Sequence, residues 1–216
     1  MASADEVSGI ARILPGRTEL HLGADARKSY LLGNLLEGVP LIHFSTHAMV
    51  DLENPERSRI LLAPPAAGRP SDYLFEEEAY SLNLKGVDLV TVSACDTARG
   101  KFVGGEGMEA FSRAFLAAGA SATVTTLWRV ADRPTADFMQ QFYYFLARGQ
   151  SKGDALRAAK LRFLHSNSAL ADPRYWGAFV LYGDGWNPMR RVLPWTWTVW
   201  AAAVAAALLA LWLRLR

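Results

Sequence analysis

Short apolar runs alternate with amphipathic stretches over most of this chain. Residues 41–46, 87–92, 122–127 and 179–182 are rich in aliphatic, β-branched and aromatic side chains, which predicts four short buried strands. Elsewhere, apolar side chains recur every three or four positions, as on a helix that packs against a sheet. The alternation predicts one α/β domain in which helices flank a mostly parallel sheet.

Three helices are predicted in the second half of the chain. The first carries Phe111 and Phe115 on its apolar face, and the second begins near Asp132 and ends at Gly149. Ser151 is expected to cap the third helix, because a serine hydroxyl accepts a backbone N–H of the first turn.

Shorter elements are predicted in the first half. The helical ones are expected over residues 3–14, 26–37 and 76–80. The strands are expected over residues 19–22, 60–63 and 82–84. Residues 64–72 contain three prolines and one glycine, a composition that is typical of an exposed loop.

The composition changes near the C-terminus. Residues 195–213 carry no charged side chain, and a helix of that length spans roughly 28 Å, about the hydrocarbon thickness of a bilayer. Tryptophans stand at both ends of this segment and arginines flank it, as at membrane interfaces. We therefore expect a single transmembrane helix as a C-terminal anchor, with the main domain in the cytoplasm; a buried core helix is the alternative.

The chain then divides into four parts. They are a poorly specified N-terminal segment (residues 1–18), one folded domain (19–187), a basic linker that contains proline (188–194) and the transmembrane helix (195–213).

Charge and cysteine content narrow the classes of function. The net charge is +2 with acids and bases interspersed, so we expect no nucleic-acid partner. One cysteine excludes an intrachain disulfide and a cysteine-cluster metal site. His43 and His47 are four residues apart, but only Asp51 is near as a third ligand, so we expect no metal and no cofactor.

The only cysteine, Cys95, follows the predicted strand over 87–92, and His47 follows the predicted strand over 41–46. The carboxyl ends of neighbouring parallel strands meet at one edge of a sheet, about 4.8 Å apart. If these strands are neighbours, Cys95 and His47 are placed as a nucleophile and its base. The alternative is a cysteine that only packs in the core.

Two further features would serve such a reaction. The backbone N–H groups of Cys95 and Ala48 are candidate donors to an oxyanion. Gly104 and Gly105 would let the backbone approach a substrate closely, although a flexible surface loop explains them equally well.

Six stretches resemble, in order, the motifs of CHAT domains, which are caspase-like cysteine peptidase domains. They are IHFSTHA at 42–48, VSACDTARG at 92–100, GGEG at 104–107, AFLAAGA at 114–120, LWRVAD at 127–132 and RYWGAFVLYG at 174–183. The resemblance implies a three-layer, caspase/hemoglobinase-like α/β fold and hydrolysis of peptide bonds. It also implies that His47 is the general base, that Cys95 is the nucleophile, that His43 is structural, and that Trp128 and Asp132 line or brace the pocket.

Three functions are compatible with these residues. The first is a membrane-tethered cysteine endopeptidase that acts on protein substrates, in bacterial signalling or defence by the resemblance. The second is a catalytically silent interaction module at the membrane, and the third is thiol acyl transfer or thioester hydrolysis by the same dyad. Family members usually have further strands before this start. Three explanations stay open: the domain is abbreviated, its start is misplaced, or a missing strand leaves an exposed N-terminal sheet edge that a protein partner could cover.

Overall fold

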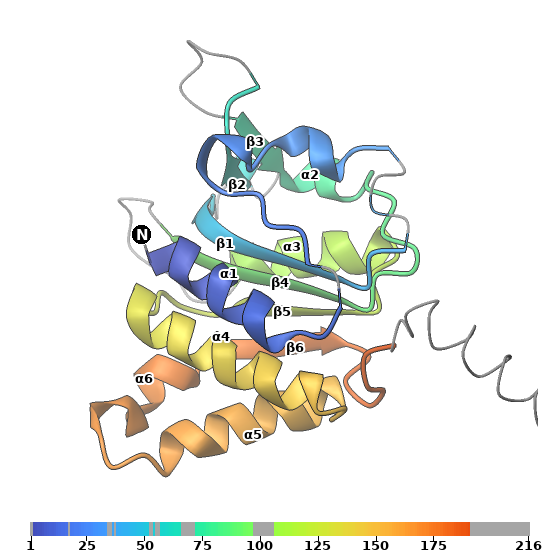
Figure 1. The fold of residues 1–216 in the computed structure, drawn as a ribbon. Coiled ribbons are helices and arrows are strands. Elements are labelled where there is room, and N and C mark those ends of the chain that lie inside the picture. Colours follow the sequence, from blue (N-terminus) through green and yellow to red (C-terminus); the bar gives the residue numbers. More distant parts are fainter. Residues whose placement is uncertain are drawn as a thin grey trace, which may run out of the picture.

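The computed structural model describes residues 2–16, 18–33, 36, 38–51, 54, 57–65, 72–96 and 106–190, with backbone alone for residues 2, 94–96, 106 and 107. In this part of the chain, six strands form one sheet in the order β3-β2-β1-β4-β5-β6 (Figure 1). The strands are β1 (Leu41–Met49), β2 (Arg59–Leu62), β3 (Asp72–Phe75), β4 (Leu89–Asp96), β5 (Ala122–Thr126) and β6 (Phe179–Gly183).

The sheet is mixed, which corrects the expectation of a mostly parallel one. Only the central strands β1, β4 and β5 run parallel to one another. The outer pairs β1–β2, β2–β3 and β5–β6 are antiparallel. For β2 and β3 the short connections 50–58 and 63–71 account for this, because a parallel neighbour needs a longer crossover. The connection from β5 to β6 spans residues 127–178, so its length does not explain the antiparallel direction of β6.

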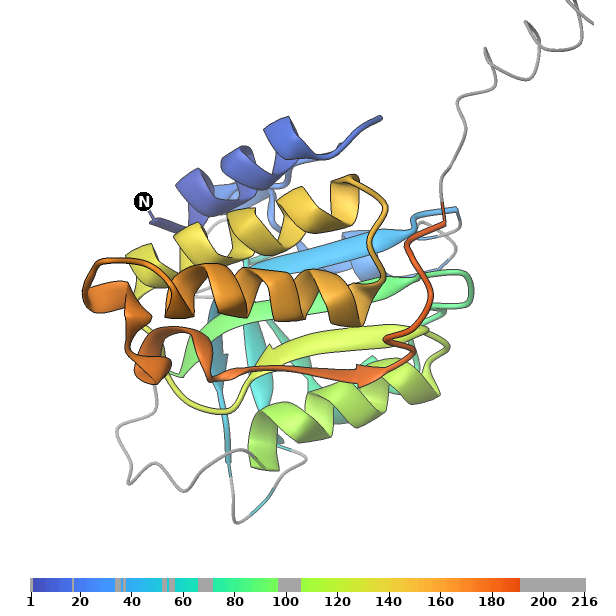
Figure 2. The same cartoon turned by 90° about the horizontal axis from the view of Figure 1, so that it is seen from below.

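Helices cover both faces of this sheet. Figures 1 and 2 show α1, α4 and α5 on one side of the sheet and α3 on the other. The helices are α1 (Ala2–Ile13), α2 (Glu76–Ala79), α3 (Glu106–Ala117), α4 (Asp132–Ala147), α5 (Lys152–Leu164) and α6 (Pro173–Trp176). Each face of the sheet has its own apolar core, so the two layers of helices are held independently.

Aromatic rings fill the core beneath α4. Phe138 is fully buried and stacks on Phe179 of β6, with ring centroids 4.0 Å apart. Phe163 of α5 packs edge to face against the Phe138 ring, with ring centroids 5.3 Å apart. One side chain thus joins α4, α5 and the sheet, which the three-and-four spacing of apolar positions predicts.

The predicted helices of the second half are confirmed. Phe111 and Phe115 of α3 are fully buried, and α4 starts at Asp132. Ser151 caps α5, because its Oγ accepts the N–H of Asp154 at 3.1 Å. The predicted turn at 76–80 and the strand near 60–63 are also confirmed, as α2 and β2.

Three predictions in the first half are wrong. Residues 19–22 and 82–84 form no strand. In the described part of the predicted helix over 26–37, the only helical element is a short 3₁₀ helix, Lys28–Leu31, and another, Gly23–Asp25, precedes it. The carbonyl of Ala26 accepts the N–H of the distant Ala63, whereas in an α-helix it would accept the N–H four residues later. Sequence reasoning also missed β3, which begins where the proline-rich loop was expected to end.

Among the described residues, no helix is both long and apolar enough to cross a membrane. The predicted transmembrane segment at 195–213 lies outside those residues.

Replacing Phe138 with alanine tests the aromatic core. We expect the free energy of unfolding to fall by about 3–5 kcal/mol, because the change leaves a cavity among α4, α5 and β6. Tyr144→Ala is the matched control on the same helix, since this ring is 40% exposed, and it should cost about 0.5 kcal/mol. Urea unfolding followed by circular dichroism measures both, and equal losses would contradict the assigned core.

Candidate functional site

The pairing of β1 with β4 brings the two predicted chemical positions together. The two strands run parallel, and His47 is the direct partner of Cys95 in their register. Their Cα atoms are therefore about one strand spacing apart, about 4.8 Å. Positions 43, 45 and 47 of β1 alternate with buried Phe44 and Ala48 and lie on the face that α1 and α4 cover.

His47 differs from the rest of its strand in exposure. Its side chain is exposed at the carboxyl end of β1, whereas Ala48 beside it is fully buried. Parallel β4 ends at the same edge of the sheet. We call this edge, where β1 and β4 end, the rim. A histidine there is open to solvent and to a substrate, as a general base must be.

A buried polar network lies below the rim on the same face of the sheet. Nε2 of His43 lies 2.8 Å from the carboxylate of Glu6 on α1, and Nδ1 lies 3.0 Å from the hydroxyl of Tyr143 on α4. The Tyr143 hydroxyl donates its proton to Oγ1 of Thr91 on β4, at 2.9 Å. The network therefore connects α1, α4 and the same two strands that carry His47 and Cys95.

Burial makes this network costly to disrupt. The side chains of Glu6 and His43 are only 4% and 7% exposed. Since a carboxylate can only accept, Nε2 of His43 donates to Glu6. Burial raises the pKa of the Tyr143 hydroxyl far above its ordinary value, so the phenol remains a donor at every physiological pH.

The pairing of His43 with Glu6 agrees with a structural role for His43. The sequence showed His43 within an apolar run, and a buried imidazole there requires hydrogen-bonding partners. It did not show that Glu6 and Tyr143 supply them. These partners are 37 and 100 positions away, and such pairings follow only from the packing of α1 and α4 on the sheet.

Trp128 and Asp132 follow the carboxyl end of β5. Nε1 of Trp128 donates to the carbonyl of Arg174 at 3.0 Å, and the ring packs so closely on Gly177 that a Cβ there would lie 3.3 Å from it. Trp128 thus braces α6. Asp132 is the first residue of α4, where its charge favours the helix dipole. Whether either lines a substrate pocket stays a prediction.

The remaining predicted site residues divide into two groups. Ala48 pairs with Ile60 on one side and Asp96 on the other, so its backbone lies at the rim. Gly104 and Gly105 lie outside the described residues.

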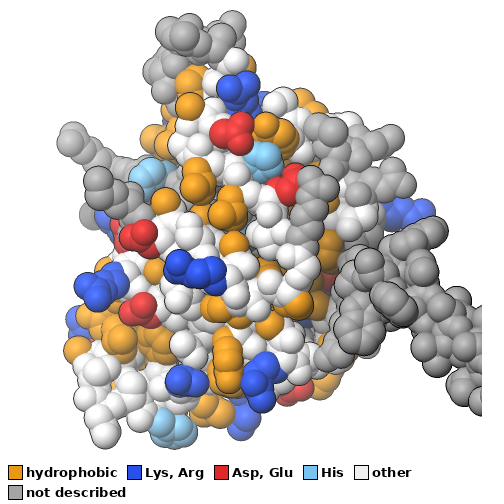
Figure 3. Space-filling view, viewed as in Figure 1, with side chains coloured by type: hydrophobic (Ala, Val, Ile, Leu, Met, Phe, Trp, Pro, Cys, Tyr) orange, Lys and Arg blue, Asp and Glu red, His pale blue; other side chains and the backbone are white. Residues whose placement is uncertain are grey.

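A shallow groove of about 350 Å³ lies along α5 and α6. Leu156, Leu161, Leu164 and Trp176 line it, with Arg157 and Lys160. Burial lowers the pKa of Lys160. Figure 3 shows the face that carries α1, α4 and α5, where apolar, basic and acidic side chains are interspersed. Within the described residues, no three acidic, histidine or cysteine side chains are grouped as metal ligands.

The fold and the rim define an α/β domain with a histidine and a cysteine at paired positions of two central parallel strands. The chain belongs to the CHAT domain family, whose sequence profile matches residues 1–184. CHAT domains are a caspase-like family.

Two mammalian proteins are similar to this chain. Tetratricopeptide repeat protein 28 of Mus musculus is 28% identical over 219 residues, which cover 85% of this chain and 9% of the mouse protein. Tetratricopeptide repeat protein 28 of Homo sapiens is 34% identical over 98 residues, which cover 45% of this chain and 4% of the human protein. The chain thus spans less than a tenth of the length of either relative.

Replacing Glu6 tests the buried network. We expect Glu6→Ala to lower the free energy of unfolding by about 3 kcal/mol, because it leaves His43 buried without its carboxylate partner. Glu6→Gln keeps an acceptor and should cost less. Asp5→Ala is the control, since Asp5 is the exposed neighbour on α1, and it should cost less than about 1 kcal/mol. Chemical unfolding measures all three, and a loss for Glu6→Ala no larger than for Asp5→Ala would contradict the network.

Proposed function

We propose that this CHAT domain is a cysteine endopeptidase that hydrolyses peptide bonds in protein substrates, and that residues 195–213 tether it to a membrane. The observation that carries the peptidase proposal is the register of β1 with β4, in which His47 and Cys95 are direct partners. We further assign the domain to the caspase/hemoglobinase-like three-layer arrangement, which helices on both faces of the sheet support.

The proposed reaction uses the two rim residues in turn. His47 removes the proton of Cys95, and the resulting thiolate attacks the carbonyl carbon of the peptide bond. The carbon–nitrogen bond then breaks while the imidazolium gives its proton to the leaving amine. Water, activated by the same imidazole, hydrolyses the thioester and restores the thiol.

Negative charge develops on the carbonyl oxygen during both attacks. Backbone N–H groups at the rim are suitable donors to this oxygen, because they are fixed by the ladder and need no reorganisation. Ala48 and Cys95 are our candidates, since both lie where β1 and β4 end. 

The membrane tether is supported by sequence alone. Residues 195–213 are long enough to cross a bilayer and have tryptophans at both ends. The bilayer is therefore the proposed location of the domain. The expected bacterial context has no support from the two mammalian relatives.

A peptide-library cleavage assay tests the peptidase proposal on the full chain in detergent or vesicles. We expect cleavage by the natural sequence, no cleavage by Cys95→Ala, and a rate lower by about 10²–10⁴-fold for His47→Ala, because the base is lost. His165→Ala is the control, since His165 is an exposed histidine at the end of α5, and it should cleave at the natural rate.

Equal cleavage by Cys95→Ala would contradict the peptidase proposal. Cleavage by none of the proteins across broad libraries would favour an interaction module instead. Adducts with an acyl-CoA thioester but not with a peptide electrophile would favour acyl transfer.

A further inference from the structure

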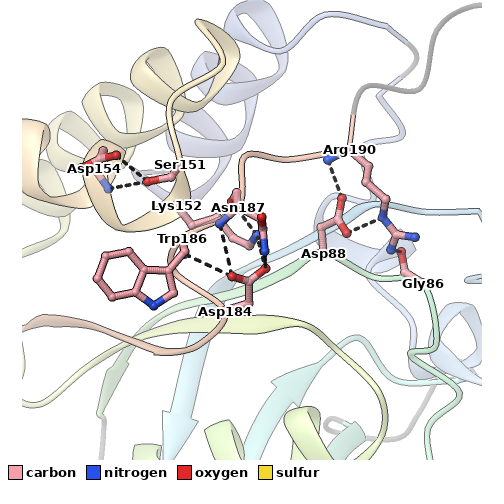
Figure 4. A network of polar contacts seen from close by, with 9 residues as sticks. All are labelled: Gly86, Asp88, Ser151, Lys152, Asp154, Asp184, Trp186, Asn187 and Arg190. Atoms are coloured by element: carbon pink, nitrogen blue, oxygen red, sulfur yellow. Dashed lines mark hydrogen bonds and ion pairs between the residues drawn. The ribbon is translucent and has the colours of Figure 1, made fainter.

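The described chain ends at a fixed point on the edge of the sheet opposite to the rim. We call this edge the base. Asp88, immediately before β4, is 4% exposed and accepts from both the backbone N–H and Nε of Arg190, each at 2.7 Å (Figure 4). Nη2 of Arg190 also donates to the carbonyl of Gly86 at 2.7 Å. Three hydrogen bonds thus hold residue 190 at the base.

The loop that leads to this point is also fixed. The backbone N–H of Asp184 donates to the carbonyl of Ser121, and the carbonyl of Gly185 accepts from Gly153, each at 2.8 Å. Lys152 is 1% exposed, and its Nζ donates to the carbonyl of Asn187 at 2.9 Å and lies 3.4 Å from the carboxylate of Asp184. A buried lysine therefore holds residues 184–187 against α5.

This fixed loop presents a tryptophan to solvent. The backbone N–H of Trp186 donates to Asp184 at 3.1 Å, while the indole points away from the polar network (Figure 4). The side chain is 91% exposed, by far the most exposed of the large apolar side chains in the described part of the chain. A rigidly mounted, exposed indole is typical of a group that sits in the headgroup region of a bilayer.

The uncharged segment begins only a few residues later. Trp195 lies five positions after Arg190, and five residue steps span at most about 17 Å. The base is therefore tied close to wherever residue 195 enters a membrane. The rim lies about 26 Å from the base along β4, since this strand has 8 residues at about 3.3 Å each.

We infer that the base of the domain, with Trp186 at its surface, rests on the lipid bilayer, and that the rim with His47 and Cys95 faces away from it. The inference rests on the proposed membrane tether and is independent of catalysis. It makes Trp186 a lipid contact in addition to the anchor, and it leaves the proposed dyad open to substrates in the aqueous phase.

The single cysteine makes the orientation measurable in the full chain. Three variants in a Cys95→Ala background each offer one thiol to a fluorescent label. Trp186→Cys places it at the base, His47→Cys at the rim, and Leu164→Cys in the groove along α5. The three proteins are placed in phosphatidylcholine–phosphatidylglycerol vesicles with or without lipids that carry a headgroup nitroxide. We expect position 186 to lose most of its fluorescence to the nitroxide, and positions 47 and 164 to lose none.

Each other outcome overturns the inference. Quenching at 47 places the rim on the bilayer, and quenching at 164 places the α5 groove there. No quenching at 186 in protein that floats with the vesicles removes the lipid contact. Protein that does not float with the vesicles removes the tether as well, but leaves the peptidase proposal intact, because that proposal is tested by cleavage.

Discussion

The parallel pairing of β1 with β4 is the constraint on which the candidate site depends. A ladder in this register sets His47 directly against Cys95 and fixes both at the carboxyl edge of the sheet. A shift of one residue would turn one of the two positions to the opposite face, because side chains alternate along a strand. The apolar residues of these strands resist that shift, since Phe44, Val90 and Val92 are buried in the core on the α3 face.

The polar network below the rim strengthens the same constraint from the other face. Glu6, His43, Tyr143 and Thr91 join two helices to the two central strands by hydrogen bonds whose geometry fits one register. Buried polar groups give little net stability when satisfied, but they penalise every arrangement that leaves them unpaired. We therefore interpret this network as a device that makes the register specific.

The sequence predicts best those elements whose stability is local. Helices α3, α4 and α5 follow from regular apolar spacing and from the cap at Ser151. The strands β1, β4, β5 and β6 follow from continuous apolar runs. The proposed dyad positions could be placed because each ends such a run.

Features that depend on distant partners could not be predicted. The stretch that begins at Ala26 does not form the predicted helix, because the carbonyl of Ala26 accepts the N–H of Ala63. Strand β3 is held in place by its pairing with β2. Nothing in the sequence around Glu6 indicates that its carboxylate is buried. Nothing indicates either that Asp88 and Arg190, which are 102 positions apart, form an ion pair. Both follow from how the layers stack, which no local pattern encodes.

The alkylation rate of Cys95 at neutral pH tests most directly whether the paired positions act as one chemical unit. If His47 activates the thiol, iodoacetamide should modify Cys95 of the natural chain at least about tenfold faster than Cys95 of His47→Ala, because only the thiolate reacts. Intact-mass spectrometry over time gives both rates. Equal rates in folded proteins would show that the register brings the two residues together without coupling them.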